Sequence, residues 1–335
     1  MKFLIILLSV LFSITTFAGE TNLKIKAKWL LAHEPIDLFK IAADTFTKEV
    51  SEKTKGQFEI EILTISEYEK KYNKGKRLMW NELIPLIQNS QVEMSQTYTT
   101  DLGQLSHSMY ALDLPYLFRD HAHAQKVLEG QTGEKLLNGL EASNLKGLAF
   151  TYSGGYRILP GQKKISRLED FKGTKVRTSL SPVAMEMFKI LGAKPVPLDL
   201  SEIEEGFKKH QINEAESTYA RYFPLGQDKQ AKILNETNHS LLLTSIIMNK
   251  KFFDALPEDY KKIVKDAAIV SARAEREYSI AKALETKKEA IFKGITVVTM
   301  SDIEMARVKT ALNPLYTQFG PMVGSDLVKA IQDQK

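Results

Sequence analysis

Two arginines stand where the chain could bind an anion. Arg157 follows Gly154-Gly155, in the expected crossover between two halves of the chain, and Arg177 ends a short expected strand over 175–177. A guanidinium at a strand end can hold a carboxylate through two parallel hydrogen bonds, which a lysine cannot reproduce. An arginine so placed is more often a structural ion-pair partner. The spacing of these two residues alone leaves both interpretations open.

Histidines offer a second kind of chemistry. His33 lies in the loop after the first expected strand, and the ligands of open α/β sheets bind beyond the carboxyl ends of strands. An ordinary surface histidine is the more common case at such a place. His121 and His123 have a spacing that suggests a metal pair. Because residues two apart on a helix point to different faces, we expect no metal site there.

The composition excludes several classes of protein. The chain has 335 residues, 46 Lys+Arg against 41 Asp+Glu, and 43% hydrophobic residues, which is ordinary for a globular protein and unlike collagen, a disordered chain or a polytopic membrane protein. It has no cysteine, which excludes disulfides, thiolate metal sites and cysteine nucleophiles. Because the lysines are scattered and form no basic block, we expect no nucleic-acid partner.

The first 18 residues have the pattern of a secretory signal peptide. Lys2 precedes an apolar run over 3–14, and Thr16-Phe17-Ala18 places small residues at the −3 and −1 positions of a cleavage site. The run is shorter than the roughly 20 apolar residues that span a bilayer. We therefore expect cleavage after Ala18. With no cysteine to accept a lipid anchor, we expect a free exported protein, which in a Gram-negative cell means the periplasm.

The next segments predict an α/β architecture. A strand with period-2 alternation over 23–29, an amphipathic helix over 37–53 and a strand over 58–62 are typical of a parallel unit. A strand over 146–152 completes a first lobe, and Gly154-Gly155 then interrupts the chain. A second α/β lobe of similar build follows, so we expect the glycine pair to act as a hinge.

One expected helix is longer than either lobe. From Pro257, a preferred first helical residue, to Lys293, neither proline nor glycine interrupts the chain. At 1.5 Å per residue such a helix is roughly 55 Å long, which exceeds the width of a small domain. We expect it to span both lobes. A break near Ser279 that divides it into two helices is the alternative.

Several motifs together resemble a known family. They are Leu114-Pro115-Tyr116-Leu117-Phe118, Gly154-Gly155-Tyr156-Arg157, Asp170 to Arg177, Gly192 to Pro197, and Ser201-Glu202. In this order and spacing the chain is similar to the DctP-type solute-binding proteins of TRAP transporters, over essentially the whole mature sequence. This family has a signal peptide, two α/β lobes and a long helix, which were predicted above independently.

The resemblance implies a periplasmic protein that closes on a small organic acid, a monocarboxylate or a dicarboxylate, and delivers it to the membrane permease subunits of a sodium-coupled TRAP transporter. Arg177 matches the carboxylate-binding arginine of the family's K-x-R motif. Arg157 matches a second cleft arginine, in a G-x-R motif. The resemblance implies no cofactor.

The chain departs from the family over 212–218, which corresponds to the family's V-D-G-x-E-N-P stretch. Ser217 replaces an asparagine that often contacts ligand, and Tyr219 falls where the C4-dicarboxylate branch often has tryptophan. For Arg221, two residues further on, the resemblance names no counterpart. The candidate ligand-binding residues are Arg177, Arg157, Ser217, Tyr219, His33 and Tyr98.

We therefore predict a two-lobed type II periplasmic-binding-protein fold, α/β in class, with a long helix spanning both lobes. Lobe I comprises 19–154 and 243–282, and lobe II comprises 155–242 and 283–335. We expect a monomer. The alternatives are an enzyme or a periplasmic ligand sensor on the same scaffold. No nucleophile and base can be placed in one cleft, which favours a protein that is not an enzyme, whereas the sequence does not separate sensing from transport.

Overall fold

The computed structural model describes residues 24–33 and 35–335, so the predicted signal peptide lies outside the described residues. The first elements are β1 (Ile25–Leu31), α1 (Ile36–Lys53), β2 (Phe58–Thr64), α2 (Ile65–Tyr72), η1 (Trp80–Glu82), α3 (Leu83–Gln88), β3 (Met94–Tyr98), α4 (Thr99–Leu102), η2 (His107–Asp113), α5 (His121–Glu129), α6 (Gln131–Asn138), η3 (Glu141–Ser143) and β4 (Leu145–Gly161), where η marks a 3-10 helix.

The middle of the chain forms η4 (Leu168–Phe171), β5 (Lys175–Thr178), α7 (Pro182–Ile190), β6 (Lys194–Pro197), η5 (Leu200–Glu202), α8 (Ile203–Lys208), β7 (Glu214–Ala215), β8 (Ser217–Thr218), α9 (Tyr219–Tyr222), η6 (Gln227–Lys229) and β9 (Ile233–Glu236). The last elements are β10 (Leu241–Asn249), α10 (Lys250–Asp254), α11 (Glu258–Phe292), β11 (Thr296–Thr299), α12 (Asp302–Ala311), α13 (Asn313–Val323) and α14 (Ser325–Asp333).

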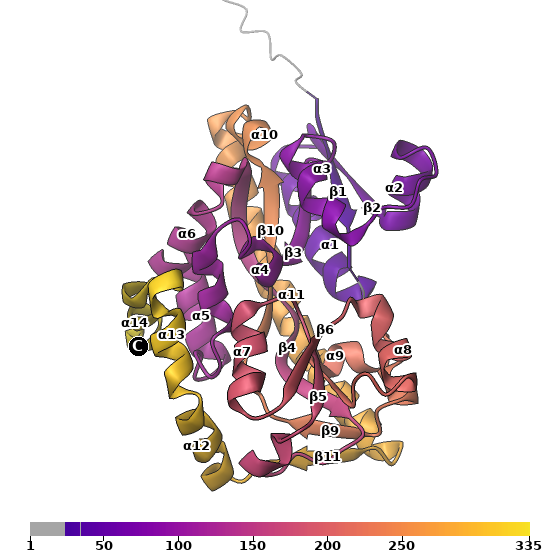
Figure 1. The fold of residues 1–335 in the computed structure, drawn as a ribbon. Coiled ribbons are helices and arrows are strands. Elements are labelled where there is room, and N and C mark those ends of the chain that lie inside the picture. The colour runs from indigo at the N-terminus through magenta and orange to yellow at the C-terminus, as the bar shows by residue number, and fades with distance from the viewer. Residues whose placement is uncertain (1–23, 34) are drawn as a thin grey trace, which may run out of the picture.

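A mixed sheet connects the two ends of the molecule. Its strand order among the described residues is β2-β1-β3-β10-β4-β7-β5-β6, with β8 and β9 also paired to β4, and β11 paired to β9. We call the end built on β1, β2, β3 and β10 the first lobe, and the end built on β5, β6, β9 and β11 the second lobe. Figure 1 shows β4 and α11 passing between the two lobes.

The predicted first unit is confirmed. β1 and β2 pair in parallel along their whole length, from Ile25 opposite Phe58 to Leu31 opposite Thr64, and α1 connects them. Trp29 of β1 is fully buried and packs edge-on against Phe46 of α1, with ring centroids 5.2 Å apart. The apolar alternation that predicted the strand is therefore the alternation that fills the core of the first lobe.

The predicted interruption at Gly154-Gly155 is instead an irregular point inside one strand. β4 continues through both glycines for 17 residues, pairing first with β10 and then with β8 and β9. Both glycines have positive φ, and the register against β10 shifts here. A Cβ on Gly154 would stand 2.2 Å from Thr218 Oγ1. The pair therefore lets β4 bulge and lets β8 approach closely.

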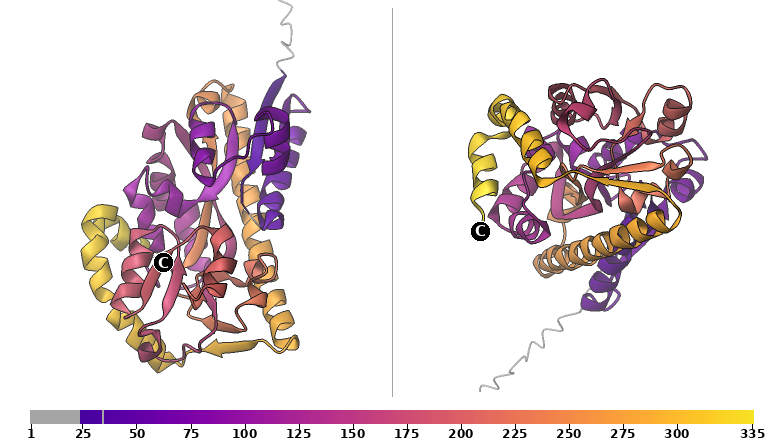
Figure 2. Two further views of the ribbon diagram at one scale, coloured as in Figure 1. Left: turned by 45° about the vertical axis from the view of Figure 1, so that its right-hand side comes forward. Right: turned by 90° about the horizontal axis from the view of Figure 1, so that it is seen from below.

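The predicted long helix is confirmed as α11, which has 35 residues and no break at Ser279. It lies along α1 and β4, as both views in Figure 2 show. Polar groups fasten it to β4 beside the glycine pair. Glu275 Oε2 accepts a hydrogen bond from Tyr152 N at 2.6 Å, and Ser279 Oγ accepts one from Gly154 N at 3.2 Å. Burial raises the pKa of Glu275 to about 8.

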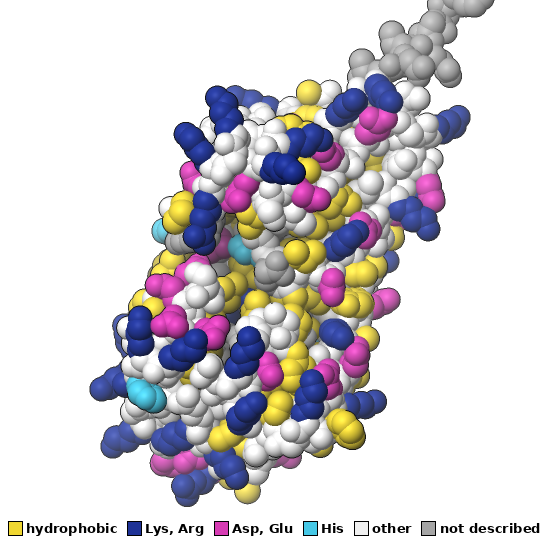
Figure 3. Space-filling model, turned by 90° about the vertical axis from the view of Figure 1, so that its right-hand side faces the viewer, with side chains coloured by type: hydrophobic (Ala, Val, Ile, Leu, Met, Phe, Trp, Pro, Cys, Tyr) yellow, Lys and Arg dark blue, Asp and Glu magenta, His cyan; other side chains and the backbone are white. Residues whose placement is uncertain are grey.

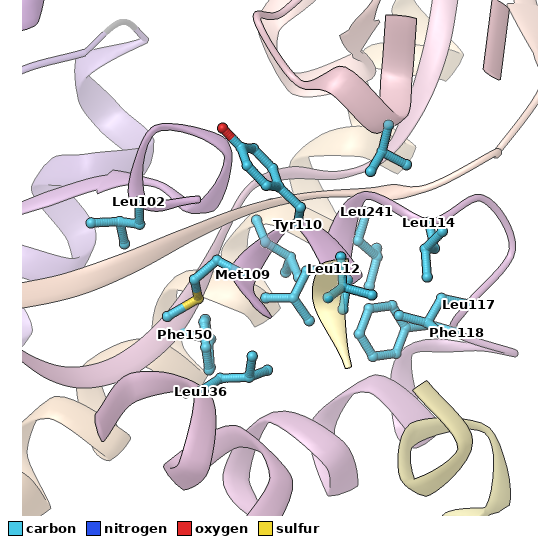
Figure 4. Packing of buried hydrophobic residues seen from close by; sticks show 14 of the residues in the cluster. Leu102, Met109, Tyr110, Leu112, Leu114, Leu117, Phe118, Leu136, Phe150 and Leu241 are labelled. Atoms are coloured by element: carbon cyan, nitrogen blue, oxygen red, sulfur yellow. The ribbon is translucent and has the colours of Figure 1, made fainter. Parts of the chain in front are cut away.

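The motif Leu114-Pro115-Tyr116-Leu117-Phe118 serves the core. Leu114, Leu117 and Phe118 are buried in the largest hydrophobic cluster, together with η2, α6 and β4 residues, as Figure 4 shows. Tyr116 adopts a positive φ, and its backbone N–H donates to His239 O at 2.6 Å. This segment of the motif therefore positions the chain around residue 239.

The C-terminal helices run along one side of the molecule (Figure 1). Glu304 of α12 accepts a hydrogen bond from Leu168 N near η4, and Tyr316 of α13 donates one to Pro115 O at 2.7 Å. Over the described residues, no helix has the length and apolar character needed to cross a membrane. On the face drawn in Figure 3, lysines and arginines are spread among acidic side chains.

Candidate functional site

Three buried arginines lie near one another where the two lobes meet, a region that we call the seam. Short strands bring them there: Arg157 of β4 lies opposite Thr218 of β8, and Arg177 at the end of β5 lies opposite Ala215 of β7. Arg221 follows on α9, directly after β8. Their exposed fractions are 4% for Arg157, 8% for Arg177 and 4% for Arg221. The segment from β7 to α9 therefore pairs with the strands of two of these arginines and carries the third.

The positive charge of Arg157 is compensated by two carboxylates of the protein. Its Nη1 lies 3.5 Å from Glu216 Oε1 and its Nη2 lies 3.6 Å from Asp113 Oδ1. His239 Nε2 lies 3.1 Å from the same Glu216 oxygen, and Thr237 Oγ1 lies 2.8 Å from the other His239 nitrogen. Burial alone would raise the pKa of Glu216, but the Arg157 charge and the His239 hydrogen bond hold that pKa at about 2. Glu216 is therefore an ionised partner of Arg157.

Arg177 has no such partner. Its Nε donates to Leu198 O at 2.9 Å, and no carboxylate oxygen of the described residues lies within 4.0 Å of its guanidinium. Burial and the neighbouring Arg221 charge lower the pKa of Arg177 to about 10. The side chain is therefore a charged group, held at one edge by the backbone and left with hydrogen-bonding capacity at the other. A buried charge in this condition is stabilised when an anion binds it.

Arg221 is also without an ion pair in the part of the chain that the structure describes. Its guanidinium carbon lies 5.5 Å from the centroid of the Tyr98 ring, and its buried Nε has no hydrogen-bond partner. Burial lowers its pKa, and the Arg157 charge lowers it further. The sequence predicts no role for Arg221, because the resemblance names no counterpart for it.

The first lobe contributes aromatic side chains to the same seam. The His33 and Tyr98 rings lie edge to face, with centroids 4.6 Å apart, and the buried His33 Nε2 has no hydrogen-bond partner among the residues that the structure describes. Burial and the Arg221 charge lower the pKa of His33 to about 4, so its imidazole is neutral at pH 7. The structure thus brings together Arg157, Arg177, His33 and Tyr98 of the predicted set.

The other two predicted residues lie differently. Ser217 is buried on β8, beside Glu216, and its hydroxyl has no partner among the described residues. Tyr219 turns into the second lobe, where its hydroxyl donates to Glu236 Oε1 at 2.8 Å and its side chain packs in a small apolar cluster with Ile158. Tyr219 is therefore not brought to the arginines through its hydroxyl.

Two further carboxylates stand at the edge of the site. Asp101 of α4 and Asp199, the N-cap of η5, are half-buried. Burial, together with the charges of Asp113 and Asp199, raises the pKa of Asp101 to about 6. Neither makes an ion pair within 4.0 Å with Arg177 or another described residue.

The histidines of the suggested metal pair diverge. His123 Nε2 lies 2.9 Å from Ile331 O, whereas His121 Nδ1 lies 3.3 Å from the Tyr152 hydroxyl. Among the described residues no group of three or more His, Asp or Glu side chains could hold a metal ion.

Residues that sequence reasoning missed complete the site. Asp113 and Glu216 pair with Arg157, and His239 contacts Glu216, but none of the three was a predicted site residue. Glu216 is the glutamate inside the stretch that matches V-D-G-x-E-N-P, and this match was the available signal for it. The role of Asp113 follows only from η2 reaching the end of β4, which is a tertiary contact.

Comparison with known proteins finds a family over most of the chain. Residues 32–321 match the profile of the family described as bacterial extracellular solute-binding protein, family 7. The 2,3-diketo-L-gulonate-binding periplasmic protein YiaO of Escherichia coli is 28% identical over 299 residues, which cover 88% of this chain and 87% of that protein.

Solved structures share the fold. A TRAP periplasmic solute binding protein from Polaromonas sp. JS666, bound to D-erythronate, matches with a TM-score of 0.82 at 25% identity, over 93% of this chain and 99% of that chain. One from Sulfurospirillum deleyianum with bound succinate matches with a TM-score of 0.79 at 25% identity, over 93% and 99% of the two chains. These matches confirm the predicted two-lobed α/β fold with its long helix.

Proposed function

This chain belongs to the bacterial extracellular solute-binding proteins of family 7, and on that premise we propose that it binds a small organic acid between its lobes and delivers it to a TRAP membrane permease. The relatives and structures above bind sugar-derived acids or succinate according to their names. A carboxylate is the group that these ligands have in common.

The observation that carries this proposal is the state of Arg177. Its guanidinium is buried, charged and held by Leu198 O at one edge, with no carboxylate partner among the described residues. A ligand carboxylate could accept two parallel hydrogen bonds from such a group, and the buried setting strengthens the attraction. Arg157, which Glu216 and Asp113 already neutralise, serves to fix the wall of the site beside it.

Export and assembly complete the proposal. We infer that residues 1–18 are removed as a signal peptide and that the mature protein works in the periplasm as a monomer. We propose the lobe boundaries predicted from the sequence, 19–154 with 243–282 and 155–242 with 283–335. The relatives are named as binding proteins, and we expect no turnover of the bound acid.

A thermal-shift screen with matched ligands tests the function. The panel pairs D-erythronate with erythritol and succinate with succinamide, so that each acid has an uncharged analogue. A ligand that binds only the folded protein stabilises it by about 2.7 kcal/mol at 100 times its Kd, and Tm rises accordingly. We expect at least one acid to raise Tm and its neutral analogue to leave Tm unchanged. Equal shifts with acids and neutral analogues would contradict carboxylate recognition.

A further inference from the structure

Arg221 gives the site a second cation that the first carboxylate does not use. It is as buried as Arg157, at 4% exposed, but it has no carboxylate within 4.0 Å among the described residues. Its Nε atom lies buried without a hydrogen-bond partner. A charged side chain that is buried in this way costs free energy unless a partner of opposite charge approaches it.

Two positive charges at the seam lack a carboxylate partner among the described residues, so two anionic groups could bind there. Glu216 and Asp113 are committed to Arg157, at 3.5 and 3.6 Å. Arg177 and Arg221 both lack an ion pair with the described residues, so a single carboxylate would offset one buried charge and leave the other. The half-buried Asp101 stands near Arg177 and has a pKa raised to about 6, but it makes no ion pair with either arginine. The protein itself therefore does not neutralise this pair.

The surroundings of Arg221 suit an acidic group that arrives from the first lobe. The Arg221 guanidinium carbon lies 5.5 Å from the centroid of the Tyr98 ring, a cation–π contact that supplies no counter-anion for its charge. His33 lies against Tyr98 with its neutral Nε2 buried and unpartnered. Arg221 belongs to α9 of the second lobe, whereas Tyr98 and His33 belong to the first. A group bound here would contact both lobes.

We propose that Arg221 is a specificity-determining residue and that the ligand is a dianion with two acidic groups, one held by Arg177 and the other by Arg221 beside Tyr98 and His33. This inference rests on the proposed function, because it assumes that Arg177 binds a carboxylate. It adds the second charge of the ligand and assigns a residue to it.

The experiment compares each diacid with its own monoamide. Isothermal titration calorimetry with malonate, succinate and glutarate, and with malonamate, succinamate and glutaramate, changes one carboxylate to an amide of nearly the same shape. Loss of a charge-assisted pair lowers affinity by about tenfold to hundredfold. We expect the wild-type protein to prefer one diacid over its monoamide by at least tenfold. In Arg221→Gln the preference should fall to about threefold or less, while affinity for the monoamide changes little.

The matched control is Arg167→Gln, which removes an exposed arginine that pairs with Asp170 and should leave the preference unchanged. Arg221→Gln removes a buried, unpaired charge, so we expect its unliganded Tm to equal or exceed that of the wild type. If that variant does not fold, Arg221→Lys retains the charge and should retain the preference for the diacid, and a wild-type protein without this preference overturns the proposal.

The two proposals fail in different ways. Binding of a monoamide as tightly as of its diacid, or an equal loss of both in Arg221→Gln, overturns the role of Arg221 and leaves the binding of organic acids intact. Absence of binding for every carboxylic acid tested, in this panel and in the thermal-shift panel, overturns both.

Discussion

The variant Arg177→Lys tests whether Arg177 binds the ligand or stabilises the fold. The lysine keeps a positive charge at the end of β5 but cannot form two parallel hydrogen bonds with one carboxylate. A charge-assisted hydrogen bond contributes about 1.5–3 kcal/mol, so its loss should weaken binding of the acid about tenfold to hundredfold. Calorimetry with the acid that gives the largest thermal shift measures this change.

Arg177→Met supplies the corresponding stability measurement. A pKa lowered to about 10 by burial means that the charged guanidinium is destabilised by about 3 kcal/mol relative to water. Methionine relieves this cost, but Leu198 O loses the donor at 2.9 Å, which costs about 1–3 kcal/mol. The two effects largely offset each other, so we expect the unliganded Met variant to be as stable as the wild type or up to about 2 kcal/mol more stable. We also expect it to bind the acid more weakly than the Lys variant.

Two results would refute this reasoning. Wild-type affinity in Arg177→Lys would show that the two parallel hydrogen bonds of the guanidinium do not hold the ligand. Unfolding of unliganded Arg177→Met, measured by urea denaturation, would show that Arg177 stabilises the fold. Arg167→Lys, at an exposed position, controls for a general effect of the substitution.

Three further outcomes are expected. Because the pKa of Glu275 is raised to about 8 when folded and is near 4.5 when unfolded, its contribution to stability should fall as pH rises from 4.5 towards 8. Glu275→Gln should remove that contribution from a urea-denaturation pH series, and curves parallel to the wild type would contradict the burial argument. Gly154→Ala should lower stability more than Gly173→Ala, since both have positive φ but only the first would place a Cβ 2.2 Å from Thr218 Oγ1; equal losses of Tm would point to backbone strain alone. N-terminal sequencing of exported protein should begin at Gly19, and retention of Met1 would refute cleavage.

Apolar periodicity and the positions of proline and glycine predicted the elements whose structure depends on nearby residues. The alternation in β1 and β2, and the run without proline or glycine in α11, each gave an element within a few residues of its observed bounds. Gly154-Gly155 was misinterpreted because glycine usually ends a strand. Here pairing with β10 and the close approach of β8 carry β4 through both residues, and those partners are distant in sequence.

The candidate site likewise combines residues that motifs predict with residues that only tertiary contacts place. Arg157 and Arg177 could be selected from motifs, because each stands at a definite point of a strand. The burial of Arg221, and its position against Tyr98, follow from the meeting of two lobes and leave no trace in the sequence nearby. The hydroxyl of Tyr219 turns towards Glu236 for a comparable reason, since a tertiary partner decides its direction.

The place of β10 in the sheet sets the order in which the protein can fold during its synthesis. β10 is built from residues 241–249 yet lies between β3 and β4, which are completed much earlier in the chain. A nascent polypeptide that ends before residue 241 has two facing strand edges with no middle strand, and such edges tend to pair with other chains. The sheet of the first lobe therefore closes only after about three-quarters of the polypeptide has left the ribosome. For the export proposed above, this topology keeps the first lobe open until late in synthesis.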